Sequence, residues 1–178
     1  GEVPADWADK PAKRSQKDTD ARWTQKHGKS HYGYKNHVNA DARHKLIREY
    51  GVTDASVHDS QAFDDLLNKG NTSSEVYADS AYRSAETERK LKARGFRSRI
   101  HKRGRRNHPL SDAETKANTR KSKVRARIEH VFGALEQMGG KLLRTIGQAR
   151  ASFAKTMMAA CYNLKRLVCF RKFGIQAF

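Results

Sequence analysis

Two carboxylates stand where carboxylates could do chemistry, and the first is Glu129. It lies in the segment KSKVRARIEHVFGALEQM, residues 121–138. Apolar residues recur there at spacings of three and four, which predicts one buried stripe of an α-helix: Val124, Ile128, Val131, Leu135 and Met138. At about 100° per residue, Glu129 falls beside that stripe, at the border between core and solvent. Glu129 is therefore a candidate functional acid, and a surface ion pair with Arg125, worth about 0.2 to 0.5 kcal/mol, is the open alternative.

Asp79 is the second candidate, because it follows a short apolar run. The segment EVYADSAY, residues 75–82, predicts a strand that carries Val76 and Ala78 and stops at Asp79. An acid at a strand end and an acid on a later helix can converge on one point although they are far apart in the chain. A turn residue or a helix cap is the alternative role for Asp79.

Two acids on a strongly basic surface indicate a site for a hard divalent ion. Mg²⁺ prefers oxygen ligands, keeps several waters and is completed by phosphate oxygens of a substrate. Two such ions about 3.5 to 4 Å apart would activate the attacking oxygen and stabilise the leaving oxygen at a phosphodiester. The predicted metal ligands are thus Asp79 and Glu129, and the predicted cofactor is Mg²⁺, with Mn²⁺ as a substitute.

The charge of the chain predicts a polyanion as its partner. Its 178 residues carry 37 Lys and Arg against 19 Asp and Glu, a net charge of +18. Bound phosphates release counterions, so this excess favours DNA over a membrane surface. Twelve of the bases fall between residues 97 and 127, a density that no packed core absorbs. The residues predicted to contact DNA are Arg125, Lys123, Arg103, Arg105, Arg106, Lys102 and Lys35.

Other classes of protein are disfavoured by what the sequence lacks. No run approaches the roughly 18 apolar residues of a membrane-spanning helix, and no apolar signal segment stands near the start. The histidines and cysteines show no zinc-finger spacing. Cys161 and Cys169 lie about 12 Å apart on one predicted helix and cannot bridge each other.

The elements that must hold these residues follow from periodicity and from turn residues. Residues 1–28 are polar and contain Pro4 and Pro11, which predicts an extended connecting segment ahead of one domain at 29–178. Strands are expected at 30–38, within 44–55, at 75–79 and within 96–103, the first two as an antiparallel hairpin. Helices are expected at 58–70, 84–95, 112–138 and 148–170. The last helix is expected to bury one stripe of side chains, made up of Phe153, Met157, Cys161, Leu164 and Val168.

Four blocks of the sequence resemble those of a known family. They are HYGYKNHV at 31–38, VTDASVHDS at 52–60, YADSAYRS at 77–84 and RARIEHVFG at 125–133. In this order, over nearly the whole chain, they resemble bacterial DDE transposases of the IS5 family, within the wider IS4-like group. The resemblance implies an α/β fold with a ribonuclease H-like mixed sheet flanked by helices. It also implies a divalent-metal site of two Asp and one Glu, and cut-and-paste transposition in which water and then a strand 3′-OH attack phosphodiesters.

The resemblance assigns roles to individual residues. Asp79 matches the second acid of the family, Glu129 the third, and Arg125 a basic residue that contacts a DNA phosphate. The Tyr and Lys that the family places around that Glu would fall at Ser122 and Glu136, so this part of the pattern is absent. The first Asp belongs on a strand expected upstream of Gly1. The chain is therefore expected to be the C-terminal part of the catalytic domain, without its first strand.

The predicted function is that of a DNA transposase catalytic domain acting on transposon ends and target DNA. With two of the three acids, the chain alone is expected to bind DNA but to be inactive in cutting it. The alternative is a non-catalytic basic DNA-binding remnant of a transposase. The expected location is the bacterial cytoplasm, at the nucleoid, and a homodimer stays an open alternative. The sequence does not predict the end sequence or the target preference.

Overall fold

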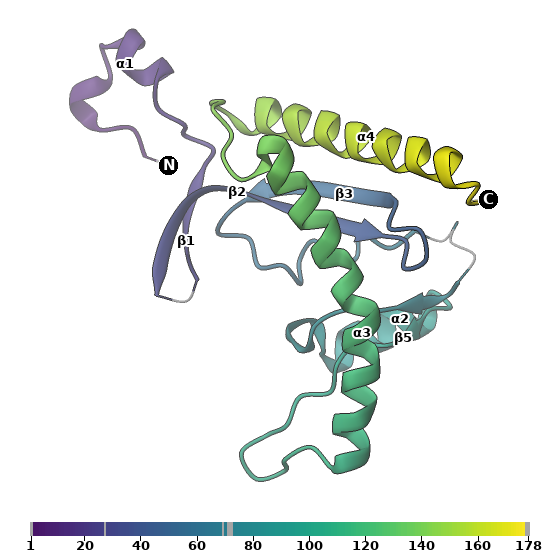
Figure 1. Cartoon of the computed structure of the whole chain (residues 1–178). Coiled ribbons are helices and arrows are strands. Elements are labelled where there is room, and N and C mark those ends of the chain that lie inside the picture. Colours follow the sequence, from purple (N-terminus) through teal and green to yellow (C-terminus); the bar gives the residue numbers. More distant parts are fainter. Residues whose placement is uncertain (1, 27, 69, 71–72, 177–178) are drawn as a thin grey trace.

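The computed structural model describes residues 2–26, 28–68, 70 and 73–176. Two small sheets are flanked by helices, so the mixed α/β class is confirmed (Figure 1). The first sheet is antiparallel, in the order β1 (Arg22–Lys26), β2 (Lys29–Ala40) and β3 (Ile47–Asp54). The second pairs β4 (Glu75–Val76) with β5 (Arg97–Ser98) in parallel.

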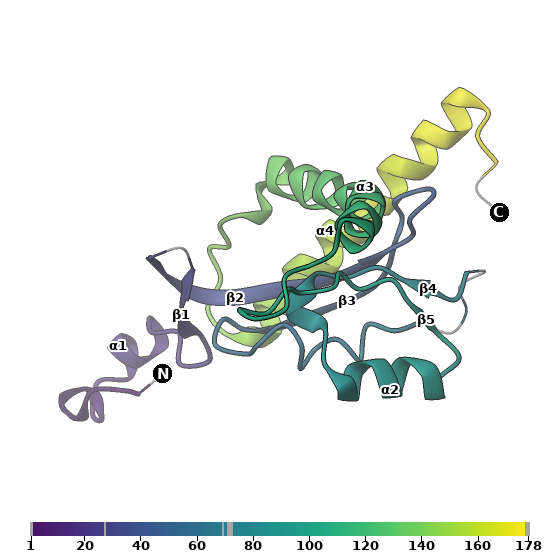
Figure 2. The same cartoon turned by 90° about the horizontal axis from the view of Figure 1, so that it is seen from below.

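The helices lie on both sides of these strands. They are η1 (Ala5–Trp7), α1 (Pro11–Ser15), η2 (Ser80–Tyr82), α2 (Ala85–Ala93), α3 (Asp112–Leu135), the π-helical turn η3 (Glu136–Gly140) and α4 (Gln148–Phe173). Figure 2 shows α3 and α2 on opposite sides of β2 and β3. The apolar residues of α4 pack with those of α3 against Val38, Ala40 and Ile47. α3 continues beyond the first sheet and passes the second, so it spans both (Figure 1).

The β2–β3 hairpin confirms the alternation seen in the sequence. Tyr34 pairs with Asp54 and Val38 with Tyr50, and the register shifts once, between Asn39 and Ala40. Val38 and Ala40 face α3 and α4 and pack against their apolar residues. The opposite face of β2 carries the buried His37, whose Nε2 is 2.9 Å from the Thr53 hydroxyl.

The apolar stripe of α3 is also confirmed as core. Val131 and Leu135 are buried in one cluster with residues of β3 and α4, and Ile128 and Met138 pack against its edge. Ser111 and Glu114 form a capping box at the start of the helix. At its end Gly139 has a φ of 84°, a left-handed conformation that favours glycine, and the chain turns back there toward α4. The expected stop at the glycine pair is therefore observed.

The helix expected at 58–70 is wrong. Residues 55–66 form successive turns and bends, held by bonds between residues three apart such as Gln61 N–H to His58 O at 2.9 Å. Side chains from outside the segment take the carbonyls that a helix would use. Asn39 Nδ2 donates to Leu66 O at 2.6 Å, and Arg94 donates to the carbonyls of residues 64 and 67. Phe63 and Leu67 are nevertheless buried, in a second apolar cluster with Leu91 and Ile100.

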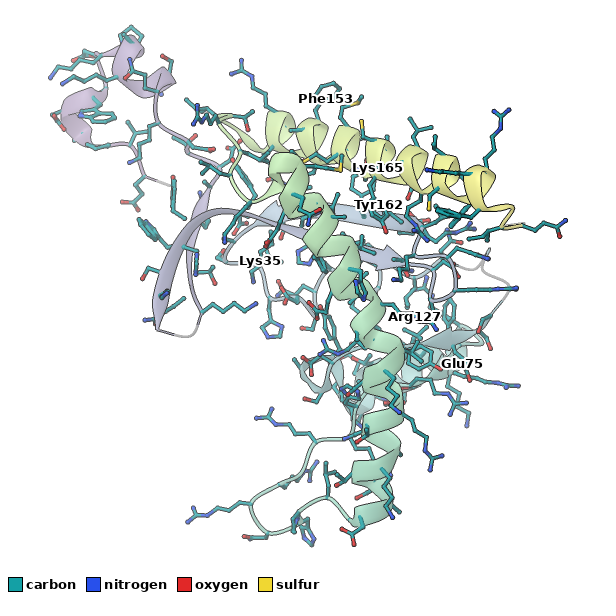
Figure 3. The ribbon with its side chains drawn as sticks, in the orientation of Figure 1. Lys35, Glu75, Arg127, Phe153, Tyr162 and Lys165 are labelled. Atoms are coloured by element: carbon teal, nitrogen blue, oxygen red, sulfur yellow. The ribbon has the colours of Figure 1, made fainter. Side chains whose placement is uncertain are left out.

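The buried face expected for α4 is also wrong. Phe153, Leu164 and Val168 are 68%, 62% and 68% exposed, and Met157 and Cys161 are exposed as well. The opposite face packs on the hairpin and on α3 through Ala151, Ala159, Tyr162 and Phe170. Figure 3 shows Phe153 pointing away from the sheet and Tyr162 toward it. Both faces of α4 are thus apolar, and the one that carries Ala151, Ala159, Tyr162 and Phe170 is buried.

Within residues 2–26, part of the segment expected to be an extended connection, the structure contains η1, α1 and β1. Residues 22–26 form β1, which pairs with β2 from Arg22 opposite Gly33 to Lys26 opposite Lys29. The carboxylate of Asp18 accepts the Tyr34 hydroxyl at 2.7 Å and the Gly147 N–H at 3.1 Å. Those bonds join the segment to β2 and to the start of α4.

The edge of β2 that β1 leaves uncovered and the outer edge of β4 are among the strand edges that have no partner strand in the described part of the chain. β3 occupies one edge of β2 over residues 34–40, and β1 reaches only residues 29–33 on β2. β4 pairs with β5 alone. None of the helices in these described ranges is long and apolar enough to cross a membrane.

We predict that the two faces of α4 differ sharply in their effect on stability. Tyr162→Ala removes a buried ring and its 2.8 Å hydrogen bond to Lys45 O, and should lower the free energy of unfolding by about 3 to 5 kcal/mol. Leu164→Ala, on the exposed face, should change it by less than about 0.5 kcal/mol. Urea unfolding of both variants measures the difference, and equal losses would contradict the observed packing.

We also predict a pH-dependent contribution from the start of α3. The Lys102 ammonium, 2.8 Å away, and the Ser111 N–H lower the pKa of Glu114 to about 2 from its usual 4.5. A lowered folded-state pKa stabilises the fold above pH 4.5, and this stabilisation is lost as the pH falls from about 4.5 to about 2. The Tm difference between the wild type and Glu114→Gln should therefore shrink over that interval. A constant difference would show that the charge of Glu114 contributes nothing.

Candidate functional site

The parallel pairing of β4 and β5 brings the ends of both strands to one edge. The His101 N–H donates to Ala78 O at 3.2 Å, so the residues that follow each strand lie side by side. Asp79 is the first residue after this pairing. Its Oδ1 accepts the Ser80 N–H at 2.5 Å and caps η2. Asp79 thus has a local turn role, one of the alternatives considered for it, whereas Ser84 and not Asp79 caps α2; the bond to Ser80 does not use Oδ2.

Polar contacts fasten the first half of α3 to the end of β5. Asn118 and the backbone of Lys102 exchange two hydrogen bonds, at 3.0 and 2.9 Å. One turn on, the Lys121 ammonium donates to Ile100 O at 2.9 Å. The Ser122 hydroxyl lies 3.2 Å from His101 Nε2. These contacts fix which residues of the next turn of α3 approach Asp79.

The residue placed there is Arg125, and both candidate acids converge on it. Its Nη1 lies 3.9 Å from Asp79 Oδ2 and 3.7 Å from Glu129 Oε1. Asp79 and Glu129 thus both approach one arginine, and the Arg125–Glu129 ion pair considered as the alternative role of Glu129 is present. The carboxylates are 51% and 64% exposed, which leaves them open to a ligand from solvent.

Burial and neighbouring charges shift the pKa values of the groups around the two acids. Burial, followed by the charge of Arg125, lowers the pKa of His101, so a neutral imidazole lies beside the acids at pH 7. Burial, followed by the charges of Asp59 and Asp79, raises the pKa of Tyr82 to about 12. Burial, followed by the charge of Arg83, lowers the pKa of Lys121. Of these groups, Tyr82 and His101 carry no charge at neutral pH.

Asp79 and Glu129 have the chemistry of a partial divalent-metal site. Their oxygens are hard ligands, are half-exposed, and already attract one cation, the Arg125 guanidinium. Within the described ranges no third carboxylate, histidine or cysteine joins them in a cluster that could hold a metal ion. Two protein carboxylates are nevertheless sufficient for Mg²⁺ when waters and phosphate oxygens complete the shell.

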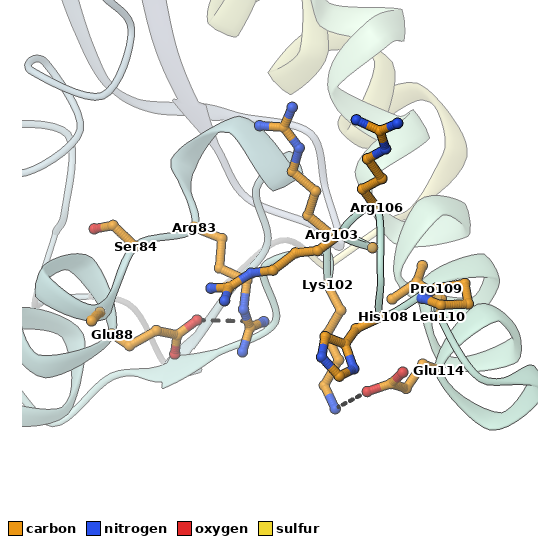
Figure 4. Close-up of a pocket in the computed structure, with 13 residues that line it drawn as sticks. Arg83, Ser84, Glu88, Lys102, Arg103, Arg106, His108, Pro109, Leu110 and Glu114 are labelled. Atoms are coloured by element: carbon orange, nitrogen blue, oxygen red, sulfur yellow. Dashed lines mark hydrogen bonds and ion pairs between the residues drawn. The ribbon is translucent and has the colours of Figure 1, made fainter.

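A basic hollow of about 930 Å³ lies beyond the end of β5. The loop at 102–110 and the start of α2 line it, and Figure 4 shows the ion pairs Arg83–Glu88 and Lys102–Glu114 along its wall. Arg103, Arg105 and Arg106 are exposed and form no salt bridge with any described residue. Arg105 and His108 form an isolated antiparallel β-bridge, in which their backbones exchange two hydrogen bonds and close the turn of the loop. These guanidinium groups are available to a polyanion.

The remaining predicted DNA contacts divide into two groups. Lys123 is exposed on α3, two residues before Arg125. Lys35 is engaged inside the protein, because its ammonium donates to Val57 O at 2.7 Å and lies 3.3 Å from Asp59. The structure thus leaves Lys123 exposed on α3 and residues 102–106 exposed beyond β5, and places Lys35 in a different set of contacts.

The site also contains residues that the sequence did not single out. His101, Arg83 and Lys121 gather around the end of β5, and the last two donate to the same carbonyl, Ile100 O. A signal for His101 exists in the sequence, since a strand following the helix after Asp79 would pair in parallel and end at the same edge. No comparable signal marks Arg83 or Lys121.

Comparison with known proteins identifies relatives of the chain. A family model described as "Transposase DDE domain" matches residues 4–164. The transposase for insertion sequence element IS1106 of Neisseria meningitidis serogroup B is 35% identical over 152 residues. This match covers 83% of the chain and 51% of the relative, so the chain spans about half the length of that curated protein. No solved structure matches the chain significantly.

Proposed function

The chain belongs to the transposase DDE domain family, and from this premise we propose that it provides the catalytic surface on which a DNA transposase cuts and joins phosphodiesters. The observation that carries the proposal is the convergence of Asp79 and Glu129 on one nitrogen of Arg125. A surface that gathers two carboxylates beside a basic hollow suits phosphoryl chemistry on a polyanion.

Asp79 and Glu129 are proposed to hold the divalent metal, Mg²⁺ or Mn²⁺. When bound, the metal supplies Lewis-acid polarisation of the phosphodiester and activation of the attacking oxygen. The protein orients both carboxylates. The Ser80 N–H holds Oδ1 of Asp79, and the α3 backbone holds Glu129 at the border of the core. In the reaction water, or a strand 3′-OH in the joining step, attacks phosphorus, and the bond to the leaving 3′ oxygen breaks.

The third carboxylate is proposed to come from a further strand between the two sheets. The edges of β2 over residues 34–40 and of β4 are both open in the described structure. A strand paired with both would make one mixed, ribonuclease H-like sheet and would reach the edge where Asp79 stands. This arrangement matches the placement of the chain in the C-terminal part of an IS5-family catalytic domain, which the four sequence blocks support.

DNA is proposed to run from the basic hollow to the two acids. Arg103, Arg105 and Arg106 would hold phosphates, with Lys102 at the wall, and Lys123 and Arg125 would contact the backbone nearer the acids. We infer transposon ends and target DNA as the substrates and the bacterial nucleoid as the location. Lys35 is the weakest of the proposed DNA contacts, because Asp59 and Val57 O already engage its ammonium.

A second candidate function is a DNA-binding remnant without catalysis. The single finding that favours it is that only two acids meet among the described residues. Under this alternative, Asp79→Asn and Glu129→Gln would leave both Mn²⁺ binding and DNA cleavage unchanged.

We predict that DNA cleavage requires both acids and additional transposase sequence. With Mn²⁺, the 178-residue chain should not cut end-sequence DNA, whereas a version extended ahead of Gly1 should cut it. Asp79→Asn or Glu129→Gln in the extended version should lower the rate by at least about 10²-fold, because each removes a metal ligand. Cleavage products on denaturing gels measure the rate.

Two outcomes would contradict this prediction in different ways. Cleavage by the short chain that is lost in Asp79→Asn would contradict the proposed third acid from an added strand. Cleavage by the extended version that survives both substitutions would contradict the proposed metal site. Glu136→Gln, an exposed acid beyond the site on the same helical run, is the matched control and should leave the rate unchanged.

We further predict that the hollow supplies much of the salt dependence of DNA binding. Replacing Arg103, Arg105 and Arg106 by Gln should reduce the slope of log K against log salt by about 0.9 for each phosphate that the protein no longer neutralises. The control replaces Lys10, Lys13 and Arg14, around α1, which lies at the opposite end of the molecule from the loop (Figure 1). Fluorescence anisotropy over a salt series gives both slopes. Equal slopes would show that only the net charge matters.

A further inference from the structure

We propose that Arg125 is an exchangeable counter-ion, which competes with the divalent metal for Asp79 and Glu129 and is drawn away from them by a DNA phosphate. Metal binding and DNA binding would thereby strengthen each other through one side chain. The inference rests on the proposed function, because it takes these two acids as the metal ligands.

The distances show that Arg125 is attracted to the acids but not fixed by them. Its two contacts, 3.9 and 3.7 Å, are longer than the roughly 2.7 to 3.2 Å of a hydrogen bond to nitrogen. Other ion pairs of the chain are tighter. Arg99 grips Glu75 with two bonds of 2.9 and 2.6 Å, and Lys90 lies 2.7 Å from Asp64. The guanidinium of Arg125 is therefore held mainly by charge.

The same guanidinium has an unused donor. Arg125 Nε is buried and has no hydrogen-bond partner among the described residues. A buried donor without an acceptor costs free energy, so this position of the side chain is incompletely satisfied. A phosphate offers two oxygens to the fork of a guanidinium and can complete the bonding that the acids leave open.

Charge decides how the exchange runs. The two carboxylates carry two negative charges, and Arg125 balances one of them. A divalent ion at the same oxygens balances both and repels the nearby guanidinium, since the two cations would lie within a few ångströms. The displaced arginine then carries an unbalanced positive charge next to the DNA. Arg125 thus stabilises the acid pair before metal binding and contacts phosphate after it.

Thermodynamic linkage makes the exchange measurable from either side. If DNA removes Arg125 from the acids, then DNA raises the affinity for metal, and metal raises the affinity for DNA by the same factor. Replacing Arg125 by a residue without the guanidinium should therefore also raise the affinity for metal. This expectation is opposite in sign to that for a merely structural residue, whose loss would disorder the acids and weaken metal binding.

The test is calorimetric titration of Mn²⁺ into the DNA-free chain and its variants. Arg125→Gln should bind Mn²⁺ about tenfold more tightly than the wild type, a typical coupling factor. Arg125→Lys keeps the charge and should stay near the wild type. Arg120→Gln removes one charge from an exposed position on the same helix, five residues away, and should also stay near the wild type. Circular dichroism checks that each variant is folded.

The second arm adds a short DNA duplex, with the titration of the duplex alone subtracted. The duplex should raise the Mn²⁺ affinity of the wild type and add much less to that of Arg125→Gln. An unchanged or weakened Mn²⁺ affinity in Arg125→Gln would overturn the counter-ion role while leaving the metal site intact. If Mn²⁺ binds neither the wild type nor any variant, the proposed metal site is overturned, and the exchange with it. The same holds if Asp79→Asn leaves the Mn²⁺ affinity unchanged.

Discussion

The architecture depends on α3 packing in two different ways along its length. The whole helix has 24 residues and is about 36 Å long. Its second half is held by apolar packing of Val131 and Leu135 on β3 and α4. The first half is held by two hydrogen bonds between Asn118 and the Lys102 backbone and by one from Lys121 to Ile100 O, all just beyond β5. The two sheets are separate in the described structure, and α3 is the element fastened to both. Glu129 sits where the polar half gives way to the apolar half, and so Asp79 and Glu129 can meet.

Sequence periodicity predicted the fold where one face of an element is apolar and the other polar. The β2–β3 hairpin and the α3 stripe follow this rule, and the capped α2 follows from Ser84 and Gly95. α4 does not follow it, since residues such as Phe153 and Tyr162 lie on opposite faces and both are apolar. Periodicity detects the helix but cannot choose its inner face. Tertiary packing makes that choice, and Ala159 and Tyr162 pack in one buried cluster with Ile47 of β3.

The turns at 55–66 show a second limit of local pattern. The apolar residues Phe63 and Leu67 occupy positions that suit a helix, and both are buried as a helix would bury them. The backbone conformation is decided by Asn39 and Arg94, which come from other elements and take the local carbonyls. Such long-range hydrogen bonds leave no trace in a short window of sequence.

The site was predictable in part for a related reason. Asp79 and Glu129 could be found because each follows a local apolar pattern and both stand out as acids on a basic chain. His101 could be recognised only once the pairing of β4 with β5 was known. The position of Arg125 between the acids could be recognised only from the distances in the structure. The basic residues proposed to contact DNA were visible as a density of bases. The sequence did not show that Lys35 bonds within the protein, because Val57 O and Asp59 come close to its ammonium only after the chain folds.

The paired bonds between Asn118 and the Lys102 backbone have a consequence for how the basic loop meets a ligand. They tie position 102 to position 118, so the chain between them is a closed loop whose ends are already fixed. A loop closed in advance has lost much of its conformational entropy during folding. Its guanidinium groups then have less freedom to lose when a polyanion arrives, and more of their interaction free energy remains as affinity. Asn118, although uncharged, would thus contribute to the proposed DNA binding by restricting the loop beforehand.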